Sequence, residues 1–418
     1  MHKEYFDIYP TTQLQGRIQL PASKSISNRA LLINALCADR ITPDNLSDCD
    51  DTQVMLRALR DMPDTIDIGA AGTAMRFLTA YLCVTPGTHI ITGTERMRHR
   101  PIGILVEALR CLGACIEYLG EEGFPPLRIT GNAELKGGEV SISGGVSSQF
   151  ISALLMIGPV LKEGLSLKLT GTVVSRPYLD MTVTIMRQYG ALVEWKSDNE
   201  VRVAPVPYQS CPYTIENDWS AASYWYEMVA LSRDPKAQVV LPGLYAESMQ
   251  GDSQVSSLFN ELGVVTAFIK EEDGTEAVRL SKGNNLACRL NCDLSSQPDL
   301  AQTIIVTVAM LDIPFTIGGL RTLRIKETDR IAALCRELGN LGLSIEDMGN
   351  DRMEWGGIWA NHVDLPEIAT YEDHRMAMAF APACLRVGGI RIMNPAVVSK
   401  SYPSYWEHLK EIGFKICS

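Results

Sequence analysis

Six stretches of this chain share one layout, in which small or polar residues lead directly into an apolar, helix-like segment. They begin near Ser25, Thr73, Ser148, Trp219, Asp299 and His374. The first turn of a helix presents unpaired N–H groups and the positive end of the helix dipole, and both favour an anion. Cations accompany several of these starts, among them Lys24, Arg76 and Arg375. The repetition predicts six similar units that hold a multiply charged anion, and the alternative is six buried helices with ordinary caps.

Short strand-like pieces with glycine-rich turns separate the six segments, for example at 89–94, 165–171 and 390–399. Strands that alternate with helices of ten to fifteen residues are typical of a layered α/β fold. The three prolines of 203–213 mark a boundary, because proline interrupts both helices and sheet interiors. We therefore expect two similar lobes with three units each. Lobe I is predicted to contain residues 1–22 and 216–418, and lobe II residues 23–215.

Composition excludes several classes of protein. The chain has 418 residues, of which 46% are hydrophobic and 21% charged, as in an ordinary globular protein. Its net charge of −11 opposes binding to nucleic acid. No apolar run reaches the ~18 residues that span a bilayer, and no secretory signal is visible. Eleven cysteines without a C-x-x-C pair favour reduced thiols, so we expect a cytoplasmic protein. We also expect a monomer that binds neither membrane nor nucleic acid.

The chain also lacks the usual cofactor and metal motifs. It contains no G-x-G-x-x-G, no G-x-x-x-x-G-K-[ST], no H-E-x-x-H and no G-x-S-x-G. The cysteines four positions apart have no histidine nearby to complete a zinc site. We therefore expect no metal and no organic cofactor.

Three segments of the first half combine cations, glycine and hydroxyl groups. In 21–29, Lys24 and Ser25 open a helix with Arg29 four residues after Ser25 on the same face. In 69–77, Gly72 allows the backbone at a helix start to approach a ligand closely. The segment 94–102 holds three arginines that include Arg100. Each pattern suits a phosphate or a carboxylate, whereas a capped surface helix or a solvated basic loop is the structural alternative.

Three further segments offer neutral or acidic side chains. Residues 146–150 contain Ser147, Ser148 and Gln149, which alone would be a helix cap. Ser175 is expected at a strand end, followed by Tyr178. Asp299 precedes Gln302 by three positions, as in a capping box, so a purely structural role at a helix start is the alternative for this carboxylate.

The densest charge cluster is 323–334, where Lys326, Glu327 and Arg330 precede an amphipathic helix. Cations at a helix start oppose its dipole, so local stability alone would not select them there. An anionic ligand would reverse that penalty, and Glu327 would then be a general acid or base beside bound charge. Arg375 and Lys400 add two more cations near the end of the chain.

Taken in order, the segments SKSISNR, AGTAMR, RPI, SSQF, SRPYLD, PDLAQ, IKETDR, DHRMAM and SKSYP resemble the family of 5-enolpyruvylshikimate-3-phosphate synthases over essentially the whole chain. The resemblance implies an inside-out α/β barrel in each of two lobes, with three βαβαββ units per lobe and the active site between them. It also implies transfer of the enolpyruvyl group of phosphoenolpyruvate to the 5-hydroxyl of shikimate 3-phosphate. The reaction would pass through a tetrahedral intermediate and release phosphate.

The resemblance further implies roles for individual residues. The implied catalytic residues are Asp299, Glu327 and Lys24, with Asp299 as the candidate proton acceptor. Shikimate 3-phosphate is expected to contact Lys24, Ser25, Arg29, Ser147, Ser148, Gln149, Ser175, Asp299 and Lys326, bordered by Tyr178. Phosphoenolpyruvate is expected to contact Lys24, Gly72, Arg100, Gln149, Arg330, Arg375 and Lys400.

Three positions depart from the common family pattern, namely Ala70, Phe77 and Thr322, and the first two are expected to alter the phosphoenolpyruvate loop. Two other functions are alternatives to this one. The sister transferases that act on UDP-N-acetylglucosamine carry a Lys-Asn pair and a loop cysteine, whereas here Ser25 follows Lys24 and no cysteine precedes Arg100. A non-catalytic anion-binding protein would not require Asp299 and Glu327.

Overall fold

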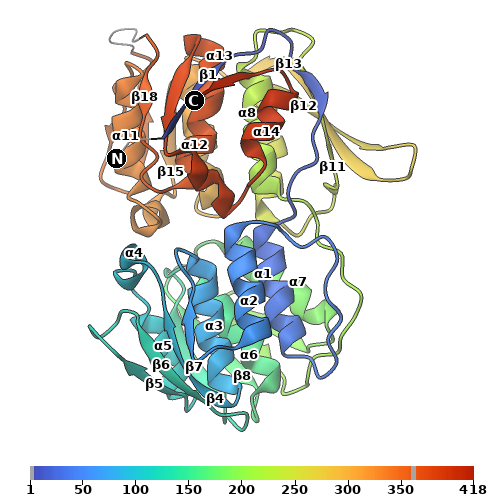
Figure 1. Cartoon of the computed structure of the whole chain (residues 1–418), viewed down its shortest axis with the longest axis vertical. Helices are drawn as coiled ribbons and strands as arrows, with labels where there is room; N and C mark the ends of the chain where they lie inside the picture. The colour runs from blue at the N-terminus through green and yellow to red at the C-terminus, as the bar shows by residue number, and fades with distance from the viewer. Residues whose placement is uncertain (1–3, 359–363) are drawn as a thin grey trace. The chain divides into compact units, whose positions relative to one another are not determined.

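The computed structural model describes residues 4–358 and 364–418 of the chain. The chain divides into two compact units, one made of residues 1–21 and 216–418 (unit 1) and the other of residues 22–215 (unit 2). Figure 1 shows that blue N-terminal and red C-terminal segments share unit 1. The pairing explains this, because strand β1 (Tyr5–Tyr9) lies between two strands from the end of the chain. Strand β1 therefore joins the start of the chain to its end in one sheet.

Unit 2 contains two copies of one βαβαββ repeat. The first copy consists of β3 (Thr65–Asp67), α3 (Gly72–Val84), β4 (Gly87–Thr92), α5 (Gly103–Cys111), β5 (Cys115–Tyr118) and β6 (Leu127–Gly131), with the short α4 (Glu95–Arg98) inserted. The second consists of β7 (Gly138–Ser143), α6 (Ser148–Ile157), β8 (Leu165–Thr170), α7 (Arg176–Gln188), β9 (Val193–Ser197) and β10 (Glu200–Val203). In both, the first two strands are parallel and the last two join antiparallel, in the order β3-β4-β6-β5 and β7-β8-β10-β9.

Unit 1 contains three copies of the same repeat, and the N-terminal strands complete two of them. The first consists of β2 (Gln15–Arg17), α8 (Trp219–Leu231), β11 (Gln238–Pro242), α9 (Val255–Asn260), β12 (Leu262–Lys270) and β13 (Glu276–Leu286). The second consists of β14 (Leu290–Asp293), α10 (Ala301–Met310), β15 (Phe315–Gly318), α11 (Arg330–Asn340), β16 (Glu346–Asp347) and β17 (Met353–Trp355). The third consists of β18 (Glu367–Ile368), α12 (His374–Phe380), α13 (Cys384–Val387), β19 (Ile390–Met393), α14 (Tyr405–Glu411), β20 (Lys415–Cys417) and β1.

The remaining part of unit 2 keeps the helices of a repeat without its sheet. It contains α1 (Lys24–Ala35) and α2 (Asp50–Asp61), and its β pairing in the described residues consists of isolated bridges, among them the one between Asp44 and Thr214. Pro43 and the prolines of 203–213 explain the difference, because each removes a backbone donor that a ladder needs. The α/β fold class is confirmed, but the sixth predicted unit has no four-stranded sheet.

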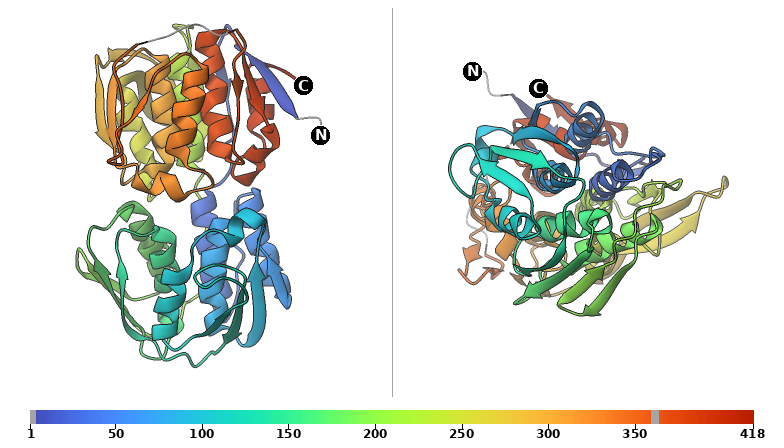
Figure 2. Two further views of the ribbon diagram at one scale, coloured as in Figure 1. Left: turned by 90° about the vertical axis from the view of Figure 1, so that its left-hand side faces the viewer. Right: turned by 90° about the horizontal axis from the view of Figure 1, so that it is seen from below.

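The six predicted helices all form, as α1, α3, α6, α8, α10 and α12. Most of them are buried on every side, which is typical of helices that lie inside a core. The sheets alternate buried and exposed positions, as β8 does, and therefore cover the helices with one face. Figure 2 shows the helices side by side within each unit with strands on the outside. The predicted strand over 390–399 ends at Met393, because Asn394 adopts a left-handed conformation and Pro395–Lys400 forms a 3-10 helix.

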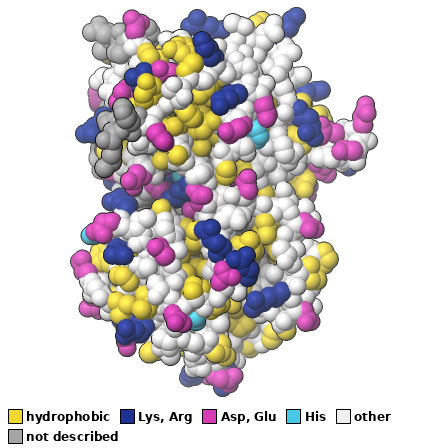
Figure 3. Space-filling model, viewed as in Figure 1, with side chains coloured by type: hydrophobic (Ala, Val, Ile, Leu, Met, Phe, Trp, Pro, Cys, Tyr) yellow, Lys and Arg dark blue, Asp and Glu magenta, His cyan; other side chains and the backbone are white. Residues whose placement is uncertain are grey.

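None of the described helices has the length and the apolar character that a bilayer span requires. On the face shown in Figure 3, acidic and basic side chains are interspersed over each unit. This surface matches the mixed charge of the sequence.

Glu227 is a fully buried carboxyl group in the middle of α8. Neither of its oxygens has a hydrogen-bond partner among the described residues, and the nearby Thr307 hydroxyl donates to the carbonyl oxygen of Thr303 at 2.6 Å. Burial raises the pKa of Glu227 well above its ordinary value, and the proximity of Thr307 offsets only part of this effect. The folded protein therefore keeps this proton to a higher pH than the unfolded chain does.

This bound proton makes stability depend on pH. Above the unfolded pKa of about 4.5, stability should fall as pH rises, by up to about 1.4 kcal/mol per pH unit from this group. Glu227→Gln keeps the shape and removes the proton, so its melting temperature should exceed that of the wild type at pH 8 and approach it near pH 5. The exposed Glu261→Gln is the control and should show the wild-type dependence. Parallel pH profiles for wild type and Glu227→Gln would contradict this account.

Candidate active site

Lys24 begins α1 directly after Ser23, whose hydroxyl accepts a hydrogen bond from the Ile26 N–H. Its ammonium group lies 3.5 Å from a carboxylate oxygen of Asp51, in the first turn of α2. Both side chains are largely buried. Sequence reasoning missed Asp51, although two aspartates at a helix start were a visible signal. The pair holds Lys24 at the helix terminus.

Arg29 lies on the next turn of α1 and is buried. Its guanidinium group donates to neutral oxygens, namely Thr182 Oγ1 at 2.7 Å, the Ser25 carbonyl at 2.8 Å, Ser152 Oγ at 3.3 Å and, more weakly, the Tyr178 carbonyl at 3.5 Å. Burial lowers the pKa of Arg29 to about 10. These bonds join the start of α1 to α6 and α7. They also bring together the predicted residues Ser25, Arg29 and Tyr178.

Gly72 is the first residue of α3, and Arg100 lies against it. A Cβ atom at position 72 would lie 2.7 Å from Nη1 of Arg100, so the arginine occupies the space that glycine leaves. Within the described part of the chain, the Nε of Arg100 has no hydrogen-bond partner. Arg76 fixes this arrangement, because it donates to the Gly72 carbonyl at 3.1 Å and to the Pro101 carbonyl at 3.3 Å. The predicted residues Gly72 and Arg100 therefore lie together, and Arg76 holds the backbone on which they stand.

The start of α6 contains the predicted Ser147, Ser148 and Gln149. Ser147 is the N-cap and accepts from the Gln149 N–H at 3.4 Å, so it has the capping role weighed as the alternative. The Gln149 side chain donates to Thr73 Oγ1 at 3.1 Å. This bond places the start of α6 beside the start of α3.

Ser175 precedes α7 and does not end a strand, which corrects the expectation for this residue. It is buried in a left-handed conformation, with φ of 54°, and its side chain makes no cap hydrogen bond. Such a conformation is unfavourable for a residue with a side chain and often marks a functional position. Tyr178 lies in the first turn that Ser175 begins.

In unit 1, Arg330 is buried at the start of α11 and contacts three carboxylates. Its Nε lies 2.6 Å from Asp373 and its Nη2 2.9 Å from Glu327, whereas its Nη1 lies 3.4 Å from Asp299. Burial by itself would lower the pKa of Arg330, but the carboxylates of Asp373, Glu327 and Asp299 together raise it. The guanidinium group therefore stays charged.

These carboxylates change the explanation for the cations at the start of α11. The sequence predicts that an anionic ligand offsets the cations at the start of α11. Asp329 caps that helix through the N–H groups of Ile331 and Ala332, and Asp373 pairs with Arg330 from the N-cap of α12. The protein itself therefore supplies compensating negative charge.

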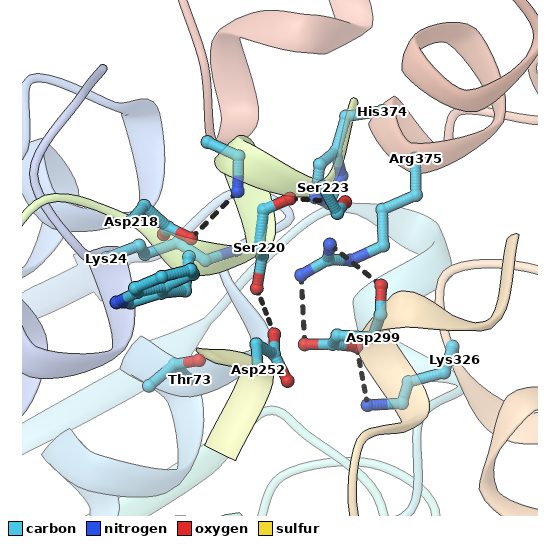
Figure 4. A network of polar contacts seen from close by, with 12 residues as sticks. Lys24, Thr73, Asp218, Ser220, Ser223, Asp252, Asp299, Lys326, His374 and Arg375 are labelled. Atoms are coloured by element: carbon cyan, nitrogen blue, oxygen red, sulfur yellow. Dashed lines mark hydrogen bonds and ion pairs between the residues drawn. The ribbon is translucent and has the colours of Figure 1, made fainter. Parts of the chain in front are cut away.

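Asp299 lies in the short 3-10 turn Pro298–Leu300 that leads into α10. One of its oxygens lies 2.9 Å from Arg375 and the other 3.6 Å from Lys326 (Figure 4). The capping-box alternative is not observed, because the amide atoms of Gln302 have no partner in the described residues. Asp299 instead joins cations from separate elements.

Glu327 contacts Lys400 at 3.0 Å in addition to Arg330. Four cations and three carboxylates thus form one cluster, which we call the unit 1 charge cluster: Lys326, Arg330, Arg375, Lys400, Asp299, Glu327 and Asp373. Burial is the largest effect on Lys326 and lowers its pKa despite the neighbouring carboxylates. The structure therefore brings together every predicted site residue of unit 1.

Asp252 lies beside this cluster and was missed by the sequence reasoning. It is buried, and the Ser220 hydroxyl donates to its carboxyl group (Figure 4). Burial, followed by the charge of Asp299, raises the pKa of Asp252 to about 7. No motif around Asp252 pointed to a site, because its surroundings arise from the packing of distant segments.

Comparison with known proteins assigns the family. The family model described as EPSP synthase (3-phosphoshikimate 1-carboxyvinyltransferase) matches residues 8–65 and 61–409. A protein of that name from Bacteroides fragilis is 55% identical over 97% of this chain and 97% of its own length. One from Photobacterium profundum is 36% identical over 98% of this chain and 99% of its own length.

The solved structures agree with this result at the level of the fold. EPSP synthase from Acinetobacter baumannii has a TM-score of 0.79 to this chain at 23% identity, with 99% of this chain and 100% of that chain covered. The order of the repeats, the charge cluster and the match over nearly the whole length lead to one assignment. This chain belongs to the EPSP synthase family.

Proposed function

We infer that the chain is a 3-phosphoshikimate 1-carboxyvinyltransferase. It transfers the carboxyvinyl group of phosphoenolpyruvate to the 5-hydroxyl of shikimate 3-phosphate and releases phosphate, a step of the shikimate pathway to the aromatic amino acids. The 55% identity to the Bacteroides fragilis protein over almost the full chain supports this function. The structural observation that carries the chemistry is the placement of Asp299 and Glu327 among four cations.

The reaction requires proton transfers in both directions. When the hydroxyl oxygen bonds to the enol carbon, the hydroxyl proton passes to a base and the methylene carbon takes up a proton. Elimination then breaks the bond to the phosphate oxygen and removes a proton from the same methyl carbon. We propose that Asp299 and Glu327 share these transfers, because both are partly exposed carboxylates with cations alongside. Lys24, the third proposed catalytic residue, is the cation expected to contact both substrates.

The proposed ligand sets are those that the family resemblance implies, and the geometry supports them in two ways. Asp373 and Glu327 occupy Nε and Nη2 of Arg330, so Nη1, with its long 3.4 Å contact to Asp299, is the group that a substrate anion can recruit. In unit 2, Arg29 has no carboxylate within ion-pair distance in the described residues. Cations placed this way can stabilise an anionic transition state without first losing a strong partner.

We also propose a setting for the enzyme. All eleven cysteines are free, which supports a reducing compartment such as the cytoplasm. We propose that the protein acts there as a monomer, without nucleic acid, membrane, metal or organic cofactor.

The function is tested by measuring phosphate release from the purified chain. Release should require both phosphoenolpyruvate and shikimate 3-phosphate, and it should persist in the presence of EDTA. UDP-N-acetylglucosamine in place of shikimate 3-phosphate should give no release. A protein that binds both substrates yet releases no phosphate would be the non-catalytic alternative.

The carboxylates are tested by Asp299→Asn and Glu327→Gln, which keep the shape but remove proton transfer. Each should lower kcat by about 10²- to 10⁴-fold, with a much smaller effect on the Kd for shikimate 3-phosphate. Asp347→Asn is the matched control, because it breaks an exposed pair with Arg324 at 2.8 Å in the same unit. If Asp299→Asn changed only the melting temperature, Asp299 would have a structural role.

The division of the proposed ligands between the units predicts a motion. One reaction can use groups from both units only if both reach the same substrates, and the chain crosses between the units near residues 22 and 215. We therefore propose that these crossings are hinges and that saturating shikimate 3-phosphate lowers the radius of gyration in X-ray scattering. An unchanged radius at saturation would contradict closure.

A further inference from the structure

Arg29 is a buried cation whose charge is not balanced by a carboxylate. Its four hydrogen bonds go to two hydroxyl groups and two carbonyl oxygens, and the described residues place no Asp or Glu within 4.0 Å of it. Arg330 in unit 1 is equally buried but contacts three carboxylates. Something other than an ion pair must therefore offset part of the cost of burying Arg29.

The aromatic ring of Phe77 is placed to offset part of this cost. Phe77 is fully buried on α3, and the Cζ atom of Arg29 lies 5.3 Å from the centre of its ring. A cation within about 6 Å of a ring face is attracted by the ring quadrupole, most strongly where water is excluded. A ring differs from a carboxylate because it stabilises the cation without supplying a full negative charge that would repel an incoming anion. Arg29 can thus be buried and still attract a phosphate or carboxylate.

The residue before Phe77 offers a matched comparison. Arg76 also lies over a phenylalanine, with its Cζ atom 5.6 Å from the ring centre of Phe150. Its guanidinium group donates to the carbonyls of Gly72 and Pro101. Gly72 is itself an expected phosphoenolpyruvate contact, and Pro101 directly follows another, Arg100. Consecutive residues of α3 therefore contact the two expected binding regions separately.

We propose that Phe77 is a positioning residue that holds the Arg29 guanidinium for shikimate 3-phosphate, and that it has little effect on phosphoenolpyruvate. The proposal rests on the proposed function, because it takes Arg29 as a ligand of shikimate 3-phosphate. It also revises the expectation that Phe77 alters the phosphoenolpyruvate loop, since the ring faces Arg29.

The first experiment compares Phe77→Leu with Phe150→Leu in the full-length chain. Phe77→Leu should raise the KM for shikimate 3-phosphate by about 2- to 30-fold and leave the KM for phosphoenolpyruvate within about 2-fold. Phe150→Leu should show the opposite selectivity, through Arg76. A rise in the KM for phosphoenolpyruvate alone in Phe77→Leu would overturn the proposal.

The second experiment separates the ring's electrostatics from its shape. Phe77 is replaced by mono-, di- and trifluorinated phenylalanine, which weakens the negative ring face stepwise at nearly constant volume. The KM for shikimate 3-phosphate should rise with each fluorine, while the melting temperature stays close to that of the wild type. A flat series would overturn the proposal even if Phe77→Leu failed to fold. A wild-type chain that releases no phosphate would instead refute the function, which keeps the two failures distinct.

Discussion

The burial of Arg330 determines how the charged groups of unit 1 are arranged. An unpaired guanidinium group in this position would be strongly destabilising, and removal of one partner from a buried pair typically costs about 3–5 kcal/mol. Asp373 approaches from the N-cap of α12, Asp299 from the turn before α10, and Glu327 from the segment before α11. One cation therefore ties three helix starts together. Lys326, Arg375 and Lys400 are in turn positioned by the carboxylates that Arg330 gathers.

The repeat explains why helix starts meet in this way. In each βαβαββ copy the first helix connects two parallel strands, so it must return along the sheet and begin at the same end each time. The starts of α8, α10 and α12 are therefore equivalent positions in unit 1. The same holds in unit 2, where the Gln149–Thr73 bond links the starts of α6 and α3. Polar residues at these starts are brought together by the fold, although they are far apart in the sequence.

This relation decides what the sequence could predict. Helix starts have local signals, so all six helices and the cluster around Lys326, Glu327 and Arg330 could be recognised from runs of a few residues. Partners that are distant in the sequence have no such signal. Asp373 meets Arg330 across 43 positions and Asp252 meets Ser220 across 32, and neither was predicted. The missing sixth sheet has a signal that could be read in two ways. The prolines of 203–213 indicate a domain boundary, but they also remove the backbone donors that a fourth strand ladder would need.

The two buried arginines show how one requirement can be met by different chemistry. Arg330 keeps its charge because carboxylates surround it, so an incoming anion has to share the guanidinium group with Asp299. Arg29 is buried among neutral oxygens beside an aromatic ring, and burial lowers its pKa toward 10. It remains protonated at neutral pH because even that lowered value lies well above 7. The arrangement around Arg330 keeps carboxylates close to the bound charge, as proton transfer requires. The arrangement around Arg29 leaves a cation that an anion can approach without repulsion from a carboxylate. The division matches the proposed roles, with proton transfer at Asp299 and Glu327 and substrate recognition at Arg29.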